Sequence, residues 1–234
     1  MAQTQPRLAE ALAALEAKAS PASLAGYARY GITAKNALGM SMRDIQAIAR
    51  TLGRDHSLAL ALWKSGVYEA RCLAAYVDVP ARVTGAQMDR WRRDFDNWGI
   101  CDTVCFVLFD RAPDAWTKVR EWADLPDEFG KRASFALLAS LAGHDKKASD
   151  RQFLDTLPLI ERAAPDGRNF VKKGVSWALR RIGHRSATLH AAAIAIARRL
   201  EASAEPAARW VGKDTLRDIT RPLVVKRIGA RRLS

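Results

Sequence analysis

Apolar and polar positions along most of the chain recur with the three- and four-residue spacing of amphipathic helices. The first such segment runs from about Pro6 to Lys18. Ser20 followed by Pro21 is a typical helix start and predicts a second helix that ends near Gly31. The chain therefore begins as a series of short helices.

Further helix starts are indicated by capping residues. Ser41 with Asp44, and Thr84 with Gln87, match the capping box, in which the first and fourth residues each satisfy a backbone N–H of the other. Helices are expected to begin directly after Ser41 and Thr84. Turn-forming residues recur at about one per helix, at Gly53–Asp55, Val79–Pro80, Ala112–Pro113, Pro126–Asp127, Gly143–Asp145, Pro165–Gly167 and Gly183–His184.

Strand patterns, with alternation of period two, are almost absent. Only the stretch from Leu223 to Ile228 is strand-like, and it carries Lys226 and Arg227. No sheet is expected, and the pattern predicts an all-α protein.

Several helical segments resemble one another, for example EARCLAAYV, ICDTVCFVL, GKRASFALL, VKKGVSWAL and VGKDTLRDI. The third residue of each segment lies about 30 to 40 residues after that of the segment before it. In chain order, these third residues are Arg71, Asp102, Arg132, Lys173 and Lys213. We call this the marked position. The period predicts a HEAT-like or armadillo-like helical repeat solenoid, forming a single curved domain over residues 1–234 with a basic tail at about 226–234.

Composition fits a cytoplasmic protein. The chain has 234 residues, of which 49% are hydrophobic, enough for a continuous core. Its beginning lacks the apolar region of a signal peptide, and no stretch is apolar enough to cross a bilayer. Neither export nor membrane insertion is expected.

Cysteine usage gives no sign of a disulfide framework or a metal site. Cys72, Cys101 and Cys105 form an odd set without CxxC spacing. Cys101 and Cys105 share a helix face, but no histidine lies nearby in sequence to complete a zinc site. We interpret all three as small buried side chains and expect no metal.

Charge says most about the partner. Lys and Arg outnumber Asp and Glu by 38 to 25, for a net charge of +13. Because residues at one repeat position line one face of a solenoid, recurrent cations predict a basic concave face that binds nucleic acid phosphates. The alternative is a solvated face with arginine stems packed between repeats. The expected DNA-binding residues are Arg71, Lys131, Arg132, Lys172, Lys173 and Lys213.

One acidic residue, Asp102, interrupts the cations at the marked position. Its neighbours are largely apolar, so its carboxylate is expected to be only partly hydrated, at a cost in free energy. Trp98 lies four residues earlier, and Trp177 lies two repeats later. The tryptophans can be core aromatics, and Asp102 can be a first-turn acid that interacts with a helix dipole. Together, however, two indoles and a carboxylate on a basic surface suggest a pocket for a cation.

A cation in DNA arises when a purine is alkylated at N3 or N7, which also makes the base a good leaving group. Hydrolysis of its N-glycosidic bond passes through an oxocarbenium-like state that a carboxylate stabilises. Asp102 could also orient or deprotonate the attacking water.

The stretch from Asn97 to Asp102, the arginine of Lys131–Ala133 and the tryptophan of Gly174–Arg180 resemble the AlkD-like DNA alkylation-repair glycosylases, which are built of HEAT-like repeats. That family pairs a Trp with an Asp four residues later, then uses an Arg in the next repeat and a Trp in a W-A-L-R context. The residues that match these four positions in order are Trp98, Asp102, Arg132 and Trp177. The resemblance covers about Tyr27 to Ile219.

The resemblance implies a monomer that acts on duplex DNA containing 3-methyladenine, 7-methylguanine or a related cationic lesion, and needs no metal or organic cofactor. Trp98 and Trp177 would contact the deoxyribose and backbone, Asp102 would stabilise the sugar cation, and Arg132 would hold a phosphate. We therefore expect a hydrolase that is cytoplasmic and associates with the nucleoid when it acts on DNA. The chain departs from the family in having Asn97 before Trp98, and Gly99 where a first Asp often lies.

Two other functions fit the same pattern. One is a non-catalytic HEAT-repeat protein that recognises damaged or branched DNA. The other is a scaffold for an acidic protein partner. Salt-dependent binding to plain duplex would exclude the scaffold, and only release of a free base separates the glycosylase from the non-catalytic DNA binder.

Overall fold

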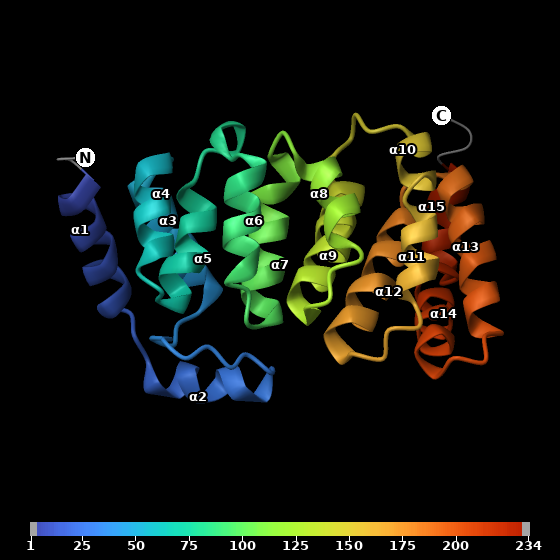
Figure 1. Ribbon diagram of the computed structural model, residues 1–234, viewed down its shortest axis with the longest axis horizontal. Helices are drawn as coiled ribbons and strands as arrows, with labels where there is room; N and C mark the ends of the chain where they lie inside the picture. Colours follow the sequence, from blue (N-terminus) through green and yellow to red (C-terminus); the bar gives the residue numbers. More distant parts are fainter. Residues whose placement is uncertain (1–3, 231–234) are drawn as a thin grey trace. The chain divides into compact units, whose positions relative to one another are not determined.

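The computed structural model describes residues 4–230, and every regular element in that range is helical (Figure 1). The prediction of an all-α protein is therefore confirmed for these residues. The α-helices are α1 (Thr4–Glu16), α2 (Pro21–Arg29), α3 (Met42–Leu52), α4 (His56–Lys64), α5 (Tyr68–Val77), α6 (Gly85–Arg93), α7 (Trp98–Val107), α8 (Ala115–Trp122), α9 (Glu128–His144), α10 (Asp150–Leu154), α11 (Leu157–Ala163), α12 (Asn169–Gly183), α13 (Ala187–Glu201), α14 (Pro206–Ile219) and α15 (Pro222–Ala230). Short 3-10 helices occur at Pro80–Arg82 and Phe109–Arg111.

The helices group into two compact units, one reaching to Asp114 and the other beginning at Ala115. The expectation of a single domain over the whole chain stays a prediction. The proposed basic tail falls partly in α15, at Lys226 and Arg227, while its last part, from Arg231 to Ser234, lies outside the described residues.

In the first unit, α5 is the central element, because it packs against α3, α4 and α7. Aromatic side chains fill the space between α4 and α6, where Trp63 and Trp91 stack with ring centroids 4.0 Å apart. Phe95 packs edge-on against Trp63, with the ring centroids 6.2 Å apart. This buried aromatic cluster supports the helices that carry the candidate site.

In the second unit, the long helices α9 and α12 form the most extensive contact, and α13 and α14 form the next. Small residues allow the backbones to approach closely. A side chain at Gly212 of α14 would collide with the backbone nitrogen of Glu201 at the end of α13. Gly212 therefore allows α13 and α14 to pack closely.

The predicted helix starts are confirmed at three capping residues. The side chains of Ser20, Ser41 and Thr84 each accept a hydrogen bond from the backbone N–H three residues later. The return bond of a capping box, which the side-chain oxygen of Gln87 would accept, was predicted but is not made. The Gln87 side chain instead lies beside Asp78, and its Nε2 donates to that buried carboxylate at 2.7 Å. Satisfying a buried carboxylate outweighs a second bond at an exposed helix end.

Two other local expectations need adjustment. The strand-like stretch from Leu223 to Ile228 is helical and forms most of α15, where Val224 and Ile228 are buried. A spacing of four residues places both side chains on one helix face, so packing outweighs β propensity there. The first helix runs from Thr4 to Glu16, about two residues before its predicted limits.

Candidate functional site

Trp98 and Asp102 lie on α7, which begins at Trp98. The side chain of Asn97 caps this helix by accepting a hydrogen bond from the backbone N–H of Ile100 at 3.1 Å. Asp102 follows Trp98 by one helical turn, so the two side chains share a face, and both are partly exposed. Asp102 lies beyond the first turn, which contains no acidic residue, so interaction with the N-terminal end of the helix dipole does not explain it.

The indole of Trp98 is fixed by a segment distant in sequence. Its Nε1 donates a hydrogen bond of 2.7 Å to the backbone carbonyl of Tyr30, which caps the end of α2. The residue pattern gives no sign of this contact, because any residue supplies a backbone carbonyl. The position of α2 therefore determines where the Trp98 ring lies.

A buried carboxylate holds the segment that follows α2. Glu69 of α5 is fully buried and accepts hydrogen bonds from the backbone N–H groups of Leu38 at 2.9 Å and Gly39 at 2.8 Å. The hydroxyl of Tyr27 lies 2.9 Å from the same carboxylate and 2.7 Å from the carbonyl oxygen of Met40. Burial, together with the charge of Glu69, raises the pKa of the Tyr27 phenol above its usual value, against the opposing effect of Met40. This network links α5 to the helix that orients Trp98.

The structure explains the glycine at position 99. A Cβ atom there would lie 2.6 Å from the hydroxyl oxygen of Tyr68 and 3.2 Å from Cδ1 of Ile32. Tyr68 is buried and its ring packs edge-on against Tyr27, so it has little room to move. An aspartate in place of Gly99 would not fit beside Tyr68.

Arg71 occupies the marked position on α5 and lies near Trp63 and Asp94. Its guanidinium carbon is 5.3 Å from the centre of the Trp63 ring, and its Nη2 is 3.5 Å from the carboxylate of Asp94. A hollow of about 210 Å³ adjoins Arg71 and is also lined by Tyr68, Asp96 and Ile100. Arg71 therefore pairs with Asp94 and also lines an open hollow.

Trp177, Lys173 and Arg132 belong to the second unit. Trp177 is partly exposed on α12, and Lys173 is exposed one turn before it. Arg132 of α9 is only 6% exposed; its Nη1 donates a 2.7 Å hydrogen bond to the carbonyl oxygen of Phe170, and its guanidinium lies 5.9 Å from the Phe170 ring centre. Arg132 therefore joins α9 to the start of α12, as the packing alternative expects, and its contact with a DNA phosphate stays a prediction.

The remaining predicted DNA-binding cations differ in how they are paired. The ammonium of Lys131 lies 3.2 Å from the carboxylate of Asp166, and that of Lys172 lies 5.3 Å from the ring centre of Trp210. Lys213 is exposed on α14. Lys173 and Lys213 are therefore the exposed cations at the marked position, and they are the best placed to meet phosphates.

Three further features of the described residues concern metal binding, the cysteines and membrane-spanning helices. Within residues 4–230, no group of three or more His, Cys, Asp and Glu side chains is placed to hold a metal ion. Cys72, Cys101 and Cys105 are buried, and burial raises the pKa of the Cys72 thiol to about 12. Among the same residues, no helix has the length and apolar character needed to cross a membrane.

The four residues that carry the family resemblance fall into two pairs. Trp98 and Asp102 are neighbours on one helix of the first unit. Arg132 and Trp177 lie on the packed helices α9 and α12 of the second. Each unit therefore supplies one tryptophan and one charged side chain.

Comparison with known proteins identifies the family. A model of the DNA alkylation repair enzyme family matches residues 11–217. The fold is similar to that of a solved protein described as one of a new family related to the HEAT-like repeat DNA glycosylases with affinity for branched DNA structures. The TM-score is 0.72 at 20% identity, covering 87% of this chain and 91% of that one. A designed armadillo repeat protein matches with a TM-score of 0.34 at 11% identity, over 77% of this chain and 95% of that one.

No curated protein sequence matches the chain. The similarity of fold confirms the predicted HEAT-like helical repeats. Because the family model spans most of the sequence, the chain belongs to the DNA alkylation repair enzyme family.

Proposed function

We propose that this protein is a monofunctional DNA glycosylase that removes cationic alkylated purines, of the 3-methyladenine or 7-methylguanine type, from duplex DNA. The observation that carries the proposal is the pair formed by Trp98 and Asp102. An indole anchored by a backbone carbonyl stands one turn before a partly exposed carboxylate, at the one marked position that lacks a cation. A surface that only bound phosphates would gain from a cation there, as in the other repeats.

The chemistry requires little from the protein beyond electrostatics. When the bond between C1′ and the alkylated base breaks, its electron pair neutralises the positive charge of the base, and the sugar becomes an oxocarbenium ion. The carboxylate of Asp102 stabilises that positive charge and orients a water molecule. The water oxygen bonds to C1′ and loses a proton to the Asp102 carboxylate, which leaves an abasic site and a free base.

The tryptophans would hold the substrate for this step. Trp98 and Trp177 offer partly exposed indole faces, which attract positive charge and pack against deoxyribose. Lys173 and Lys213 supply exposed positive charge for the DNA backbone. Arg132 would hold a phosphate beside the Phe170 carbonyl, to which its Nη1 already donates. In this proposal the protein acts as a monomer and requires no metal or organic cofactor.

Base release from a duplex that carries a single 7-methylguanine tests the proposal directly. Under single-turnover conditions, wild type should release the free base and Asp102→Asn should not. The variant should bind DNA as well as wild type or better, because it removes a negative charge near phosphates. Equal release by both proteins would refute the catalytic role of Asp102.

A second candidate is a non-catalytic protein that recognises branched DNA. It is favoured by the fold shared with a protein described as having affinity for branched DNA structures, and by Gly99, where an aspartate often lies in the glycosylases. A four-way junction bound more tightly than duplex of equal length, without base release from any alkylated duplex, would support this candidate.

A further inference from the structure

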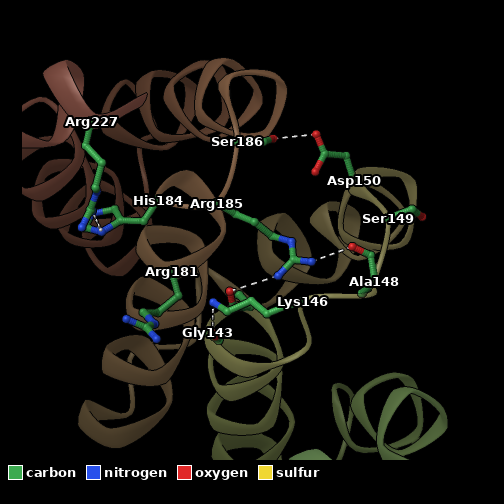
Figure 2. A pocket seen from close by; sticks show the side chains of 11 residues that line it. Gly143, Lys146, Ala148, Ser149, Asp150, Arg181, His184, Arg185, Ser186 and Arg227 are labelled. Carbon is green, nitrogen blue, oxygen red and sulfur yellow. Dashed lines mark hydrogen bonds between the residues drawn. The ribbon is translucent and has the colours of Figure 1, made fainter. Parts of the chain in front are cut away.

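A large basic pocket lies wholly within the second unit, where the ends of α9 and α12 meet the starts of α10 and α13 (Figure 2). Its volume is about 640 Å³, which is within the usual range for small-molecule sites. Four cationic side chains line it, namely Lys146, Arg181, Arg185 and Arg227, together with a single carboxylate, that of Asp150.

The one carboxylate at the pocket is already engaged. Asp150 accepts a 2.6 Å hydrogen bond from the hydroxyl of Ser186. In Figure 2 this pair lies at the edge of the site, away from Arg181 and Lys146. Asp150 therefore does little to neutralise the cations that converge on the opposite side.

Arg185 lines one side of the pocket and is held there by two contacts. Its Nη2 donates to the carbonyl oxygen of Ala148 at 2.6 Å, and its guanidinium lies 4.4 Å from the ring centre of Phe153. Because Arg185 covers this ring, the pocket offers no aromatic face on which a base could stack. The lining is otherwise small or polar, which favours a compact, strongly charged ligand.

Arg181 and Lys146 carry charge that no carboxylate balances. Among residues 4–230, Arg181 makes neither a hydrogen bond nor an ion pair, and Lys146 bonds only to the carbonyl oxygen of Gly143, at 2.5 Å. The absence of a side chain at Gly143 makes room for the Arg181 guanidinium, since a Cβ atom there would collide with its Nη2. The backbone thus admits an arginine that has no internal partner.

His184 adds a polar neutral group beside Arg227. Its Nδ1 lies 3.0 Å from Nη2 of Arg227, and its Nε2 lies 2.9 Å from the carboxylate of Asp218. Since a guanidinium can only donate, Nδ1 accepts and Nε2 carries the proton. Desolvation lowers the pKa of His184; the carboxylate of Asp218 raises it, and the charge of Arg227 lowers it further. A neutral imidazole therefore orients Arg227 at the pocket.

We propose that this pocket binds phosphate groups. Lys146, Arg181 and Arg227 line one hollow, where their like charges repel one another until an anion neutralises them. The phosphates would come either from a DNA strand or from a free phosphate compound. Arg181 favours the strand, because it follows Trp177 and Lys173 at successive turns on one face of α12. This site needs no base excision, and its lining does not include Asp102.

The probe is inorganic pyrophosphate, titrated into the full-length protein by calorimetry at low, constant ionic strength. Wild type should bind it saturably, and Arg181→Gln should bind it about tenfold or more weakly, the usual effect of losing a charged hydrogen bond. Arg198→Gln, at an exposed position of α13 outside the pocket, removes the same charge and should bind like wild type. Gly143→Ala should also weaken binding without any change of net charge, because it displaces Arg181. Circular dichroism would verify that each variant folds.

Competition with DNA identifies the source of the phosphates. If saturating pyrophosphate weakens duplex binding and Arg181→Gln does the same, the pocket receives a DNA strand. If pyrophosphate binds but duplex affinity is unchanged, the ligand is a free phosphate compound. The absence of saturable binding in wild type would overturn the proposal, and so would an equal loss in Arg181→Gln and Arg198→Gln.

Discussion

Replacing Gly99 by alanine should destabilise the protein through one identifiable contact. The new Cβ would lie 2.6 Å from the hydroxyl oxygen of Tyr68, well inside the usual contact distance. Overpacking of this kind costs about 1–3 kcal/mol, whereas alanine in a helix gains up to about 1 kcal/mol over glycine. Because Tyr68 is only 6% exposed, its ring cannot swing into solvent to relieve the contact. We expect a net loss of about 1–2 kcal/mol in the free energy of unfolding.

A double-mutant cycle isolates this contact from helix propensity. Tyr68→Phe removes the hydroxyl oxygen, so Gly99→Ala should be nearly neutral or stabilising in that background. The coupling measured by urea unfolding should be about 1–3 kcal/mol, the cost of the overpacking alone. If Gly99→Ala cost the same in both backgrounds, Tyr68 would not be the reason for the glycine. Alkylated-base release by the same variants would then show whether a shift of Trp98, next to Gly99, also impairs function.

Three further predictions concern a salt bridge, the thiols and a buried arginine. Hydrogen bonds from Arg168 lower the pKa of Asp166, so the ionised carboxylate stabilises the fold above the unfolded pKa of about 3.9, and this stabilisation is lost as pH falls through the lower folded pKa. Asp166→Asn should therefore lower the free energy of unfolding in urea by about 1 kcal/mol at pH 7. A cost of the same size below the folded pKa would contradict this pH dependence. Because burial raises the pKa of Cys72 to about 12, the native thiol should react only slowly with a disulfide reagent at pH 8 but readily in urea, and rapid native labelling would show that it is accessible. Arg132→Ala should lower the free energy of unfolding by about 2 kcal/mol, because it removes the hydrogen bond to the Phe170 carbonyl and the packing of a buried side chain. If Arg132 also contacts a DNA phosphate, Arg132→Ala should bind DNA more weakly, and its affinity should depend less steeply on salt concentration. Unchanged DNA binding would refute the phosphate contact.

Local signals in the sequence were sufficient for much of the helical architecture. Ser20, Ser41 and Thr84 begin helices because their short polar side chains satisfy a free backbone N–H wherever the following residues can form a helix. The same pattern at Ser149 and Gln152 forms a complete capping box at the start of α10 and could have been found in the same way. These signals act within one helical turn, so they do not depend on the rest of the fold.

The candidate site was predictable where residues lie on one helix and not where they meet across the fold. The spacing of Trp98 and Asp102 alone places them on one face of α7. The bond from Trp98 to the Tyr30 carbonyl joins residues 68 positions apart, and no sequence pattern records it. Arg132 shares its repeat position with Lys173, yet the first is buried against Phe170 and the second is exposed, because neighbouring helices differ.

The phosphate pocket illustrates the same limit. The sequence shows that basic residues recur at Lys146 and Arg181, but not that they converge with Arg185 and Arg227 from different elements of the second unit (Figure 2). Convergence depends on the packing of α9 against α12 and on the missing side chain of Gly143. Charge can be counted in a sequence, whereas its concentration at a site requires the fold.

We propose that Asp102 is the residue that makes this member of the DNA alkylation repair family a glycosylase. The most direct measurement is single-turnover release of 7-methylguanine from a defined duplex by wild type and by Asp102→Asn, with DNA affinity measured in parallel. We expect release by wild type, loss of release in Asp102→Asn, and equal or tighter DNA binding by that variant. Tight, salt-dependent binding without release by wild type would contradict this expectation and identify a non-catalytic DNA-binding protein.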